Sequence, residues 1–219
     1  GGKEEPTENP NASKPRYIWI DAAANFPDFA NSKENIARDL ALAKDAGFTD
    51  IVVDVRPTTG DVLFKTNIVD QVKFMYAWIG SNYTKVERTA TWDYLQAFVD
   101  EARKQGLRIH AAINTFVGGN QIDGGTGLLY RDQSKAEWAT QMNMQTGIVS
   151  VMNTSESTKF FNPAHPEVQT FLCDLLKDLA SYDLDGIFLD RGRFLNLQTD
   201  FSEESRKQFE EYMGGIRIQ

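Results

Sequence analysis

Charged and amide side chains stand near the ends of several short apolar segments, where they could do nucleophilic or acid–base chemistry. Asp190 closes the segment "LDGIFLD", Asp54 and Arg56 stand two residues apart in "DIVVDVRP", and Asn114 stands near the end of "LRIHAAINTF". An ionised aspartate can act as a nucleophile, and a nearby arginine keeps the pKa of that aspartate low. The same groups could instead form an interior ion pair. The sequence leaves both interpretations open.

The segments that carry these residues have the length and composition of buried strands. They are rich in Ile, Val and Phe and span residues 17–22, 50–57, 107–116 and 185–190. Amphipathic patterns that predict helices lie between and after them, over residues 31–47, 91–106, 165–182 and 202–214. Ser32 is the expected N-cap of the first helix, and Gly106 ends the second. Strands that alternate with helices predict right-handed βαβ crossovers and a parallel sheet.

The polarity of the four strands differs between their two faces. Alternate residues of a strand point to opposite faces, and in each strand one set is purely apolar, as a face packed under helices requires. The other set carries the polar groups, mostly toward the carboxyl end. Its members are Trp19, Asp21, Val52, Asp54, Arg56, His110, Ala112, Asn114, Phe188 and Asp190. This pattern is typical of the interior of a (β/α)8 TIM barrel, whose active site lies at the C-terminal mouth. A doubly wound sheet has helices on both faces and should carry fewer polar groups.

The chain is too short to supply a complete barrel. Only 29 residues follow Asp190, enough for one helix, whereas a (β/α)8 barrel takes about 250 residues. We therefore predict an α/β fold that covers about the first four βα units, the N-terminal half. An isolated half would expose its inner face and sheet edges, so we expect it to self-associate or to be completed by another segment. The long stretches 57–106 and 115–184 leave room for further helices or hairpins, for example in "GDVLFKTNIV".

Composition restricts the partners and cofactors. The formal net charge of −8 repels phosphate backbones and argues against nucleic acid. No apolar run is long enough to span a bilayer. One cysteine, Cys173, precludes an internal disulfide and a multi-cysteine zinc site. No G-x-G-x-x-G motif follows the first strand, and the run "VGGNQIDGGTG" predicts a flexible surface loop. Asp54, His110 and Asp190 lack the spacing of a metal site, so neither a cofactor nor a metal is expected.

The N-terminal residues 1–15 differ in composition from the rest. They are rich in Gly, Pro, Asn and charge, which predicts a flexible tether before a single domain over 16–219. Such a tether would suit an exported protein of the periplasm or cell surface, lipid-anchored or processed.

Three stretches carry a family resemblance. "VRPTTGDVLF", "NPAHPEV" and "YDLDGIFLDR" resemble the bacterial glycosyl-hydrolase-like family ten, extracellular or lipoprotein TIM-barrel proteins related to the α-amylase superfamily. The resemblance extends from Pro15 to about Gly214. It implies that Asp190 is the nucleophile and that Asn114 helps to hold the sugar pocket, while Arg56 matches the arginine of the family's "VRP" segment. The sequence departs from the superfamily at Phe188, where an arginine is usual.

The resemblance implies a retaining glycoside hydrolase, or its N-terminal portion, acting on an α-linked glycan. The general acid of such enzymes usually comes from the fifth strand, which lies outside this chain. Further candidates for contact with the oligosaccharide are Asp21, which could instead cap the following loop, and His110, for which an interior structural role is the alternative. Arg191, in the loop after Asp190, is another candidate. The rival hypothesis is a non-catalytic glycan-binding or surface-interaction protein on a degenerate barrel.

Aromatic side chains in the long second insertion have two possible roles. Trp78, Tyr83 and Trp92 could stack on sugar rings, although packing beneath the insertion is the commoner role for such residues.

Overall fold

The computed structural model describes residues 14–190, 193–197 and 203–218. At its centre is a five-stranded sheet in the order β1-β2-β5-β10-β11. The four predicted strands are confirmed as parallel neighbours, with the bounds β1 Tyr17–Ile20, β2 Asp50–Arg56, β5 Arg108–Ile113 and β10 Gly186–Leu189. The fifth strand, β11 (Arg193–Asn196), pairs antiparallel with β10.

Helices connect and cover the strands. They are α1 (Ala22–Phe29), α2 (Lys33–Asp45), α3 (Tyr94–Gln105), α4 (Leu128–Arg131), α5 (Pro166–Ala180) and α6 (Glu203–Ile218). Ser32 Oγ accepts the Asn35 N–H at 3.1 Å as the N-cap of α2. Gly106 ends α3 with a φ of +69°, a conformation that favours glycine. Both helix boundaries match the expectation from the sequence.

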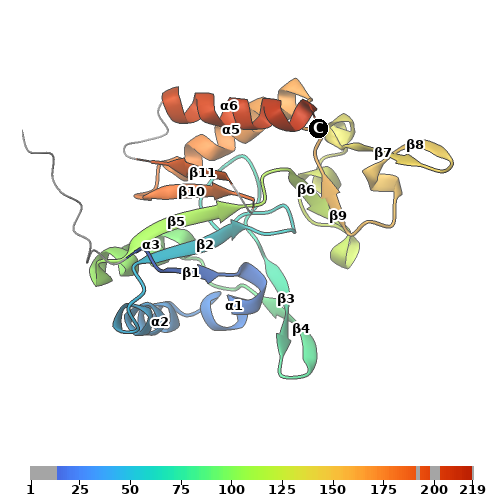
Figure 1. The fold of residues 1–219 in the computed structure, drawn as a ribbon. Helices are drawn as coiled ribbons and strands as arrows, with labels where there is room; N and C mark the ends of the chain where they lie inside the picture. Colours follow the sequence, from blue (N-terminus) through green and yellow to red (C-terminus); the bar gives the residue numbers. More distant parts are fainter. Residues whose placement is uncertain (1–13, 191–192, 198–202, 219) are drawn as a thin grey trace, which may run out of the picture.

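The predicted division into two faces is confirmed. Residues of the apolar set are completely buried under the helices: Ile51, Val53, Val55, Ile109, Ala111, Ile187 and Leu189. Each parallel strand is followed by a helix, so the chain forms about four βα units of a TIM-barrel architecture (Figure 1). The parallel strands therefore end at a common edge, as the sequence predicted.

The sheet curls around its polar face. Trp19 on β1 and Phe188 on β10 are separated by two strands in the sheet, yet their ring centroids lie 5.1 Å apart. Tyr17 also contacts Phe188, at 6.2 Å. Strands in a flat sheet lie about 4.8 Å from each neighbour, so this contact requires strong curvature. Trp19 is 52% exposed on this inner face.

Two-stranded antiparallel sheets fill the long insertions, and two of them, β3–β4 and β7–β8, are hairpins. β3 (Phe74–Ile79) pairs with β4 (Asn82–Glu87), β6 (Val117–Asn120) with β9 (Thr158–Phe160), and β7 (Gln141–Met144) with β8 (Gly147–Ser150). Three 3-10 turns complete the connections: η1 (Ile122–Gly124), η2 (Gln133–Trp138) and η3 (Val151–Asn153). The segment "GDVLFKTNIV", where we expected a further helix or hairpin, contributes only a bridge between Val62 and Gln71.

The glycine-rich run after β5 is closely packed rather than a loose loop. A Cβ atom on Gly127 would lie 2.6 Å from the Cα of Gly119, closer than real side-chain atoms approach. The expectation of a flexible surface loop was therefore wrong, because the glycines allow two backbone segments to touch.

Candidate functional site

A cavity opens at the carboxyl ends of the parallel strands. Its volume is about 340 Å³, and it is lined by residues that include Asp21, Asp54, Asn114 and Asp190. Three carboxyl groups and one amide from four different strand ends therefore border one space. The same position holds the active sites of parallel α/β barrels.

Asp190 is held in place by hydrogen bonds. Its Oδ1 accepts the Thr115 N–H at 3.0 Å, and its Oδ2 accepts the hydroxyl of Tyr212 on α6. Its own N–H donates to the Ile113 carbonyl at 2.9 Å. The backbone of Asp190 is left-handed, with a φ of +53°. An observed outlier of this kind at a cavity is typical of a functional position, because surrounding contacts must maintain it.

Asp54 is the carboxyl whose acidity changes most. Burial between the strands raises the pKa of Asp54 from 3.8 to about 7, and the negative charge of Asp21 adds to the effect. The Arg56 N–H, which donates to Asp54 Oδ1 at 3.1 Å, acts in the opposite direction. Near neutral pH a substantial fraction of Asp54 therefore carries a proton and could give it to a ligand.

Asp21 and Asn114 complete the rim of the cavity. Asp21 Oδ1 accepts the Ala24 N–H at 2.7 Å and caps α1, as one of our two interpretations expected. Asn114 Nδ2 donates to the Arg56 carbonyl at 2.9 Å. The amide oxygen of Asn114 is therefore the atom of this side chain that we consider for contact with a ligand.

Arg56 has a structural role that the sequence did not indicate. It is 1% exposed, and its guanidinium donates to the carbonyls of Asn114 (2.6 Å), Thr115 (2.9 Å) and Val117. Burial lowers the pKa of Arg56 to about 10. The side chain ties the turn after β5 to β2 and does not line the cavity. This geometry contradicts the expectation that Arg56 contacts a ligand, and its contact with Asp54 is through the backbone N–H rather than an ion pair.

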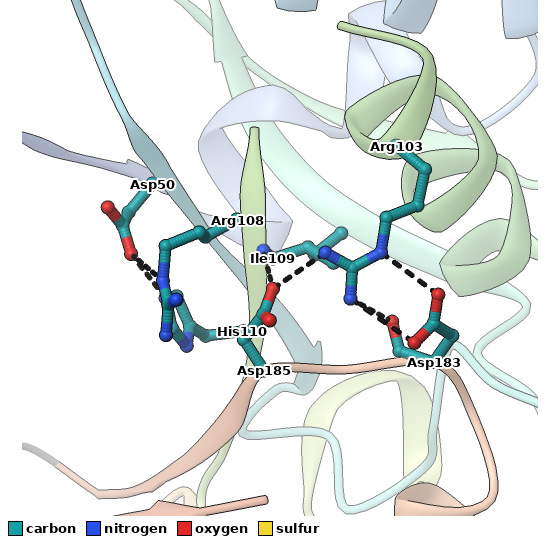
Figure 2. A network of polar contacts seen from close by, with 7 residues as sticks. All are labelled: Asp50, Arg103, Arg108, Ile109, His110, Asp183 and Asp185. Atoms are coloured by element: carbon teal, nitrogen blue, oxygen red, sulfur yellow. Dashed lines mark hydrogen bonds and ion pairs between the residues drawn. The ribbon is translucent and has the colours of Figure 1, made fainter. Parts of the chain in front are cut away.

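His110 lies near the opposite end of the strands from the cavity. Its Nε2 is 2.7 Å from Asp50 Oδ2, and both side chains are buried. Figure 2 shows this pair beside Arg108, whose Nε lies 3.4 Å from the same carboxylate. The structural alternative that we considered for His110 therefore fits its position, and the expectation of substrate contact does not.

Three residues remain: Arg191, which the sequence indicated, and Thr115 and Tyr212, which it did not. Arg191 lies outside the described residues. Tyr212 was not expected at the site, because nothing in the helical pattern of α6 shows that it reaches a strand end. Thr115 contacts Asp190 through its backbone N–H, which every residue except proline has, so the residue type could not indicate this contact.

Two kinds of site are not found in the described parts of the chain. No group of three or more His, Cys, Asp or Glu side chains in residues 14–190, 193–197 and 203–218 could hold a metal ion. None of the helices within these ranges combines the length and the hydropathy needed to cross a lipid bilayer.

Sequence comparison finds relatives along most of the chain. The family described as Glycosyl hydrolase-like 10 matches residues 14–214. An S-layer-related protein of Niallia circulans is 30% identical over 210 residues, which cover 93% of this chain and 13% of that protein. The glycosyl hydrolase DigH of Escherichia coli (strain K12) is 24% identical over 210 residues, which cover 86% of this chain and 44% of that protein. The chain thus spans less than half the length of either relative.

Solved structures share the fold. A GH36 α-galactosidase, AgaA of Geobacillus stearothermophilus, has a TM-score of 0.54 at 14% identity over 94% of this chain and 26% of that chain. A hypothetical protein from Ruminiclostridium thermocellum ATCC 27405 has a TM-score of 0.50 at 13% identity, and the match covers 91% of each chain. These similarities support the TIM-barrel type of architecture.

Proposed function

The chain belongs to the glycosyl hydrolase-like 10 family, and from this premise we propose that it is the N-terminal part of a retaining glycoside hydrolase. The observation that carries the proposal is the position of Asp190, at the end of β10 in a cavity shared with Asp21, Asp54 and Asn114. Family membership makes a carbohydrate the expected ligand, and the cavity provides carboxyl and amide groups that can bind sugar hydroxyls.

In the proposed reaction Asp190 attacks the anomeric carbon of the bound sugar. The glycosidic C–O bond breaks as a general acid protonates the leaving oxygen, and a glycosyl ester forms on Asp190. Water then hydrolyses the ester, and the former acid takes the proton of that water. Thr115 N–H and Tyr212 position the nucleophilic carboxylate, and the bond from Tyr212 must yield when Asp190 Oδ2 attacks.

The general acid has two candidate origins. The first is a carboxyl from a later strand of the completed barrel, as in the superfamily that the sequence resembles. The second is Asp54, which lines the same cavity and whose pKa of about 7 suits proton donation near neutral pH. Asp54→Asn distinguishes them: it abolishes turnover in the second case and only perturbs the pH–rate profile in the first.

Substitution of Asp190 tests the proposal. In the intact protein, Asp190→Asn should lower the hydrolysis of a reactive glycan by at least about 1000-fold and leave glycan affinity nearly unchanged. Asp45→Asn, which changes an exposed aspartate at the end of α2, is the control and should have no effect. Full turnover by the Asp190→Asn variant would reject Asp190 as the nucleophile.

A non-catalytic glycan-binding protein is the second candidate. It is favoured by one observation: both carboxylate oxygens of Asp190 already have protein donors, as they would in a purely structural anchor. In that case the intact protein binds oligosaccharides without cleaving them, and its complete reading frame has no acidic residue at the end of a fifth strand.

The proposed location is outside the cytoplasm. The similarity to an S-layer-related protein supports a place at the cell surface or in the periplasm, with the N-terminal residues as a tether. Protease treatment of cells tests this. A protein at the cell surface should be digested in intact cells, and a periplasmic protein should be digested once the outer envelope is opened. Cytoplasmic markers should stay intact in both cases.

A further inference from the structure

The β3–β4 hairpin has one anchored face and one free face. Met75 and Ala77 point to the same side and are buried, at 6% and 3% exposure. The alternate residues Phe74, Tyr76 and Trp78 occupy the other side. The anchored side fixes the hairpin to the domain, so the aromatic row on the free side has a defined position.

The exposed rings form an ordered group. Tyr83 on β4 faces Trp78 across the hairpin, with ring centroids 5.2 Å apart, and it stacks on Tyr76 at 5.3 Å with an interplanar angle of 28°. Trp78 and Tyr83 are 68% and 58% exposed. Rings as exposed as these contribute little to packing the core, although they remain in contact with one another. An exposed group of aromatic rings of this kind suits a ligand with apolar faces.

Two of these rings, Tyr76 and Tyr83, line a groove of mixed character, and Trp78 lies one strand repeat from Tyr76 toward the tip of the hairpin. The groove has a volume of about 560 Å³ and is lined by aromatic side chains of the hairpin together with hydroxyl and amide groups that include Thr58, Asn120, Gln121 and Ser157. Aromatic surface on one side and hydrogen-bonding groups on the other match the two kinds of surface of a sugar ring, its C–H faces and its hydroxyl edges.

The groove continues into the carboxylate cavity. Ala23, Thr58 and Met75 line both spaces. A ligand chain with one unit beside Asp190 can therefore extend over these three residues toward Tyr76 and the hairpin without leaving the surface.

Asp123 contacts two side chains on the aromatic face of the hairpin, Tyr76 and Lys85. Asp123 Oδ1 accepts the Tyr76 hydroxyl at 2.9 Å, and Asp123 Oδ2 is 2.9 Å from Lys85 Nζ. Lys85 also lies over the Phe74 ring, at 4.4 Å. Lys85 is paired with Asp123, and Glu87, opposite Phe74 on the same face, is acidic. Together with the net charge of −8, this disfavours an anionic ligand.

We propose that the aromatic platform formed by Tyr76, Trp78 and Tyr83 binds further sugar units of an uncharged glycan whose reacting unit lies in the carboxylate cavity. This inference rests on the proposed function and adds that the substrate is an extended chain rather than a short saccharide. The platform supplies affinity for the distant units and takes no part in the chemistry.

Binding measurements with oligosaccharides of different length test the platform. The probes are dimers and hexamers of glucose, in α- and β-linked forms, and of N-acetylglucosamine, titrated calorimetrically into the intact protein carrying Asp190→Asn so that no ligand is consumed. The hexamer of at least one series should bind more tightly than its dimer. Trp78→Ala and Tyr83→Ala should each weaken hexamer binding by about 10-fold and leave dimer binding unchanged.

A matched control comes from another hairpin. Ile148 on β8 is 68% exposed, as Trp78 is, and Ile148→Ala should leave the affinity for the hexamer unchanged. Circular dichroism of all three variants checks that each folds.

The outcomes separate the two proposals. If none of the oligosaccharides binds, both the proposed function and the platform are rejected. If they bind but hexamer and dimer affinities are equal, or the ring substitutions change nothing, the platform alone is wrong. Self-association of the protein that depends on Trp78, with no effect of the rings on glycan affinity, would also overturn it and assign the surface to protein contact.

Discussion

At the scale of single residues, the cavity shows how enclosure sets the chemistry of a carboxyl group. Asp54 and Asp190 line the same space. Burial together with Asp21 raises the pKa of Asp54 to about 7, although the backbone N–H groups of Arg56 and Ala22 donate to its carboxyl group. Asp190 accepts two hydrogen bonds, from Thr115 and Tyr212, which fix the orientation of its carboxyl group.

The raised pKa of Asp54 predicts a pH-dependent effect on stability. Because the folded pKa of about 7 lies above the ordinary 3.8, the contribution of Asp54 to stability is complete below about pH 4 and is lost as pH rises through 7. Asp54→Asn imitates the protonated form. The free energy of unfolding of this variant should exceed that of the parent protein, and the excess should be about 2 kcal/mol larger at pH 8 than at pH 5, measured by urea denaturation. The control Asp45→Asn should show no such trend, and an equal effect of Asp54→Asn at both pH values would contradict the assigned pKa.

Arg56 predicts a loss of stability rather than a loss of affinity. Its guanidinium serves three backbone carbonyls while 1% exposed, and lysine lacks the planar fork that reaches all of them. Arg56→Lys should lower the free energy of unfolding by about 3 kcal/mol, measured by thermal and urea denaturation. Arg38→Lys, at a side chain 57% exposed, should change it by less than about 0.5 kcal/mol. Parent-like stability of Arg56→Lys would show that the carbonyls do not depend on the guanidinium.

Residue roles were the least predictable part of the site. Strand parity and strand ends could indicate that Asp21, Asn114 and Asp190 border one cavity. Parity could not show that Arg56 is long enough to turn toward the carbonyls after β5, because that depends on the path of a loop. For His110, parity gave the right face, and its position in the strand placed it deeper than Asn114, but neither could show its contact with Asp50 of the neighbouring strand.

At the scale of secondary structure, a polar cluster at the amino-terminal end joins three of the parallel strands. Asp50 of β2 contacts His110 and Arg108 of β5, and Asp185, directly before β10, accepts the Ile109 N–H of β5 at 2.8 Å (Figure 2). These contacts lie at the end of the strands opposite the cavity, where they hold neighbouring strands together.

Asp185 predicts acid sensitivity of this cluster. Partial burial alone would raise the pKa of Asp185, but the Ile109 N–H and Arg103, 2.9 Å away, outweigh burial and hold the pKa below its ordinary value. The stabilisation is therefore present above about pH 4 and is lost as pH falls through the lower, folded-state pKa. Asp185→Asn should lower the free energy of unfolding by about 1–2 kcal/mol at pH 7 and by less at pH 3, measured by urea denaturation.

The control for this prediction binds the same arginine. Asp183 is 74% exposed and lies 3.0 Å from Arg103. Asp183→Asn should cost less than about 0.5 kcal/mol at either pH. A cost that is equal for both variants would show that the Ile109 N–H adds nothing to the cluster.

Elements with a strong pattern could be predicted, and elements within insertions could not. The four parallel strands carry apolar runs and the helices after them carry complete amphipathic stripes. The β3–β4 hairpin has a clear local signal, because Phe74, Tyr76 and Trp78 alternate and Gly80 with Ser81 forms a two-residue turn at a φ of +62° for the glycine. We instead predicted a helix or hairpin in "GDVLFKTNIV", which is another apolar segment of the same insertion. In the fold this segment fills the core through Val62, Leu63 and Phe64.

At the scale of the whole molecule, the described sheet is open. Within the described residues β1 has a hydrogen-bonded neighbour on one side only, and Tyr17 and Trp19 on the inner face are 42% and 52% exposed. An open strand edge beside exposed rings is suited to pair with further strands, from another segment of the same protein or from a second copy. The number of units could be predicted from chain length, whereas what covers the open side could not.

The open sheet predicts association of the 219-residue chain by itself. Sedimentation velocity should show an average mass that rises with protein concentration, and Trp19→Lys should reduce this rise because it places a charge on the inner face. Ile148→Lys, at a similarly exposed position far from that face, is the control. A strictly monomeric parent chain over the accessible range of concentrations would contradict the prediction.

The left-handed backbone at Asp190 determines which substitutions at this position keep the native backbone conformation. Asn is the other side chain that tolerates such a conformation, and Gly adopts it without cost, so Asp190→Asn and Asp190→Gly report on the lost carboxylate while the polypeptide path is kept. Val or Ile at this position would combine a chemical change with a steric penalty at the backbone. In a saturation screen scored by abundance as well as by activity, the tolerated set at position 190 should therefore be Asp, Asn and Gly for abundance and Asp alone for activity.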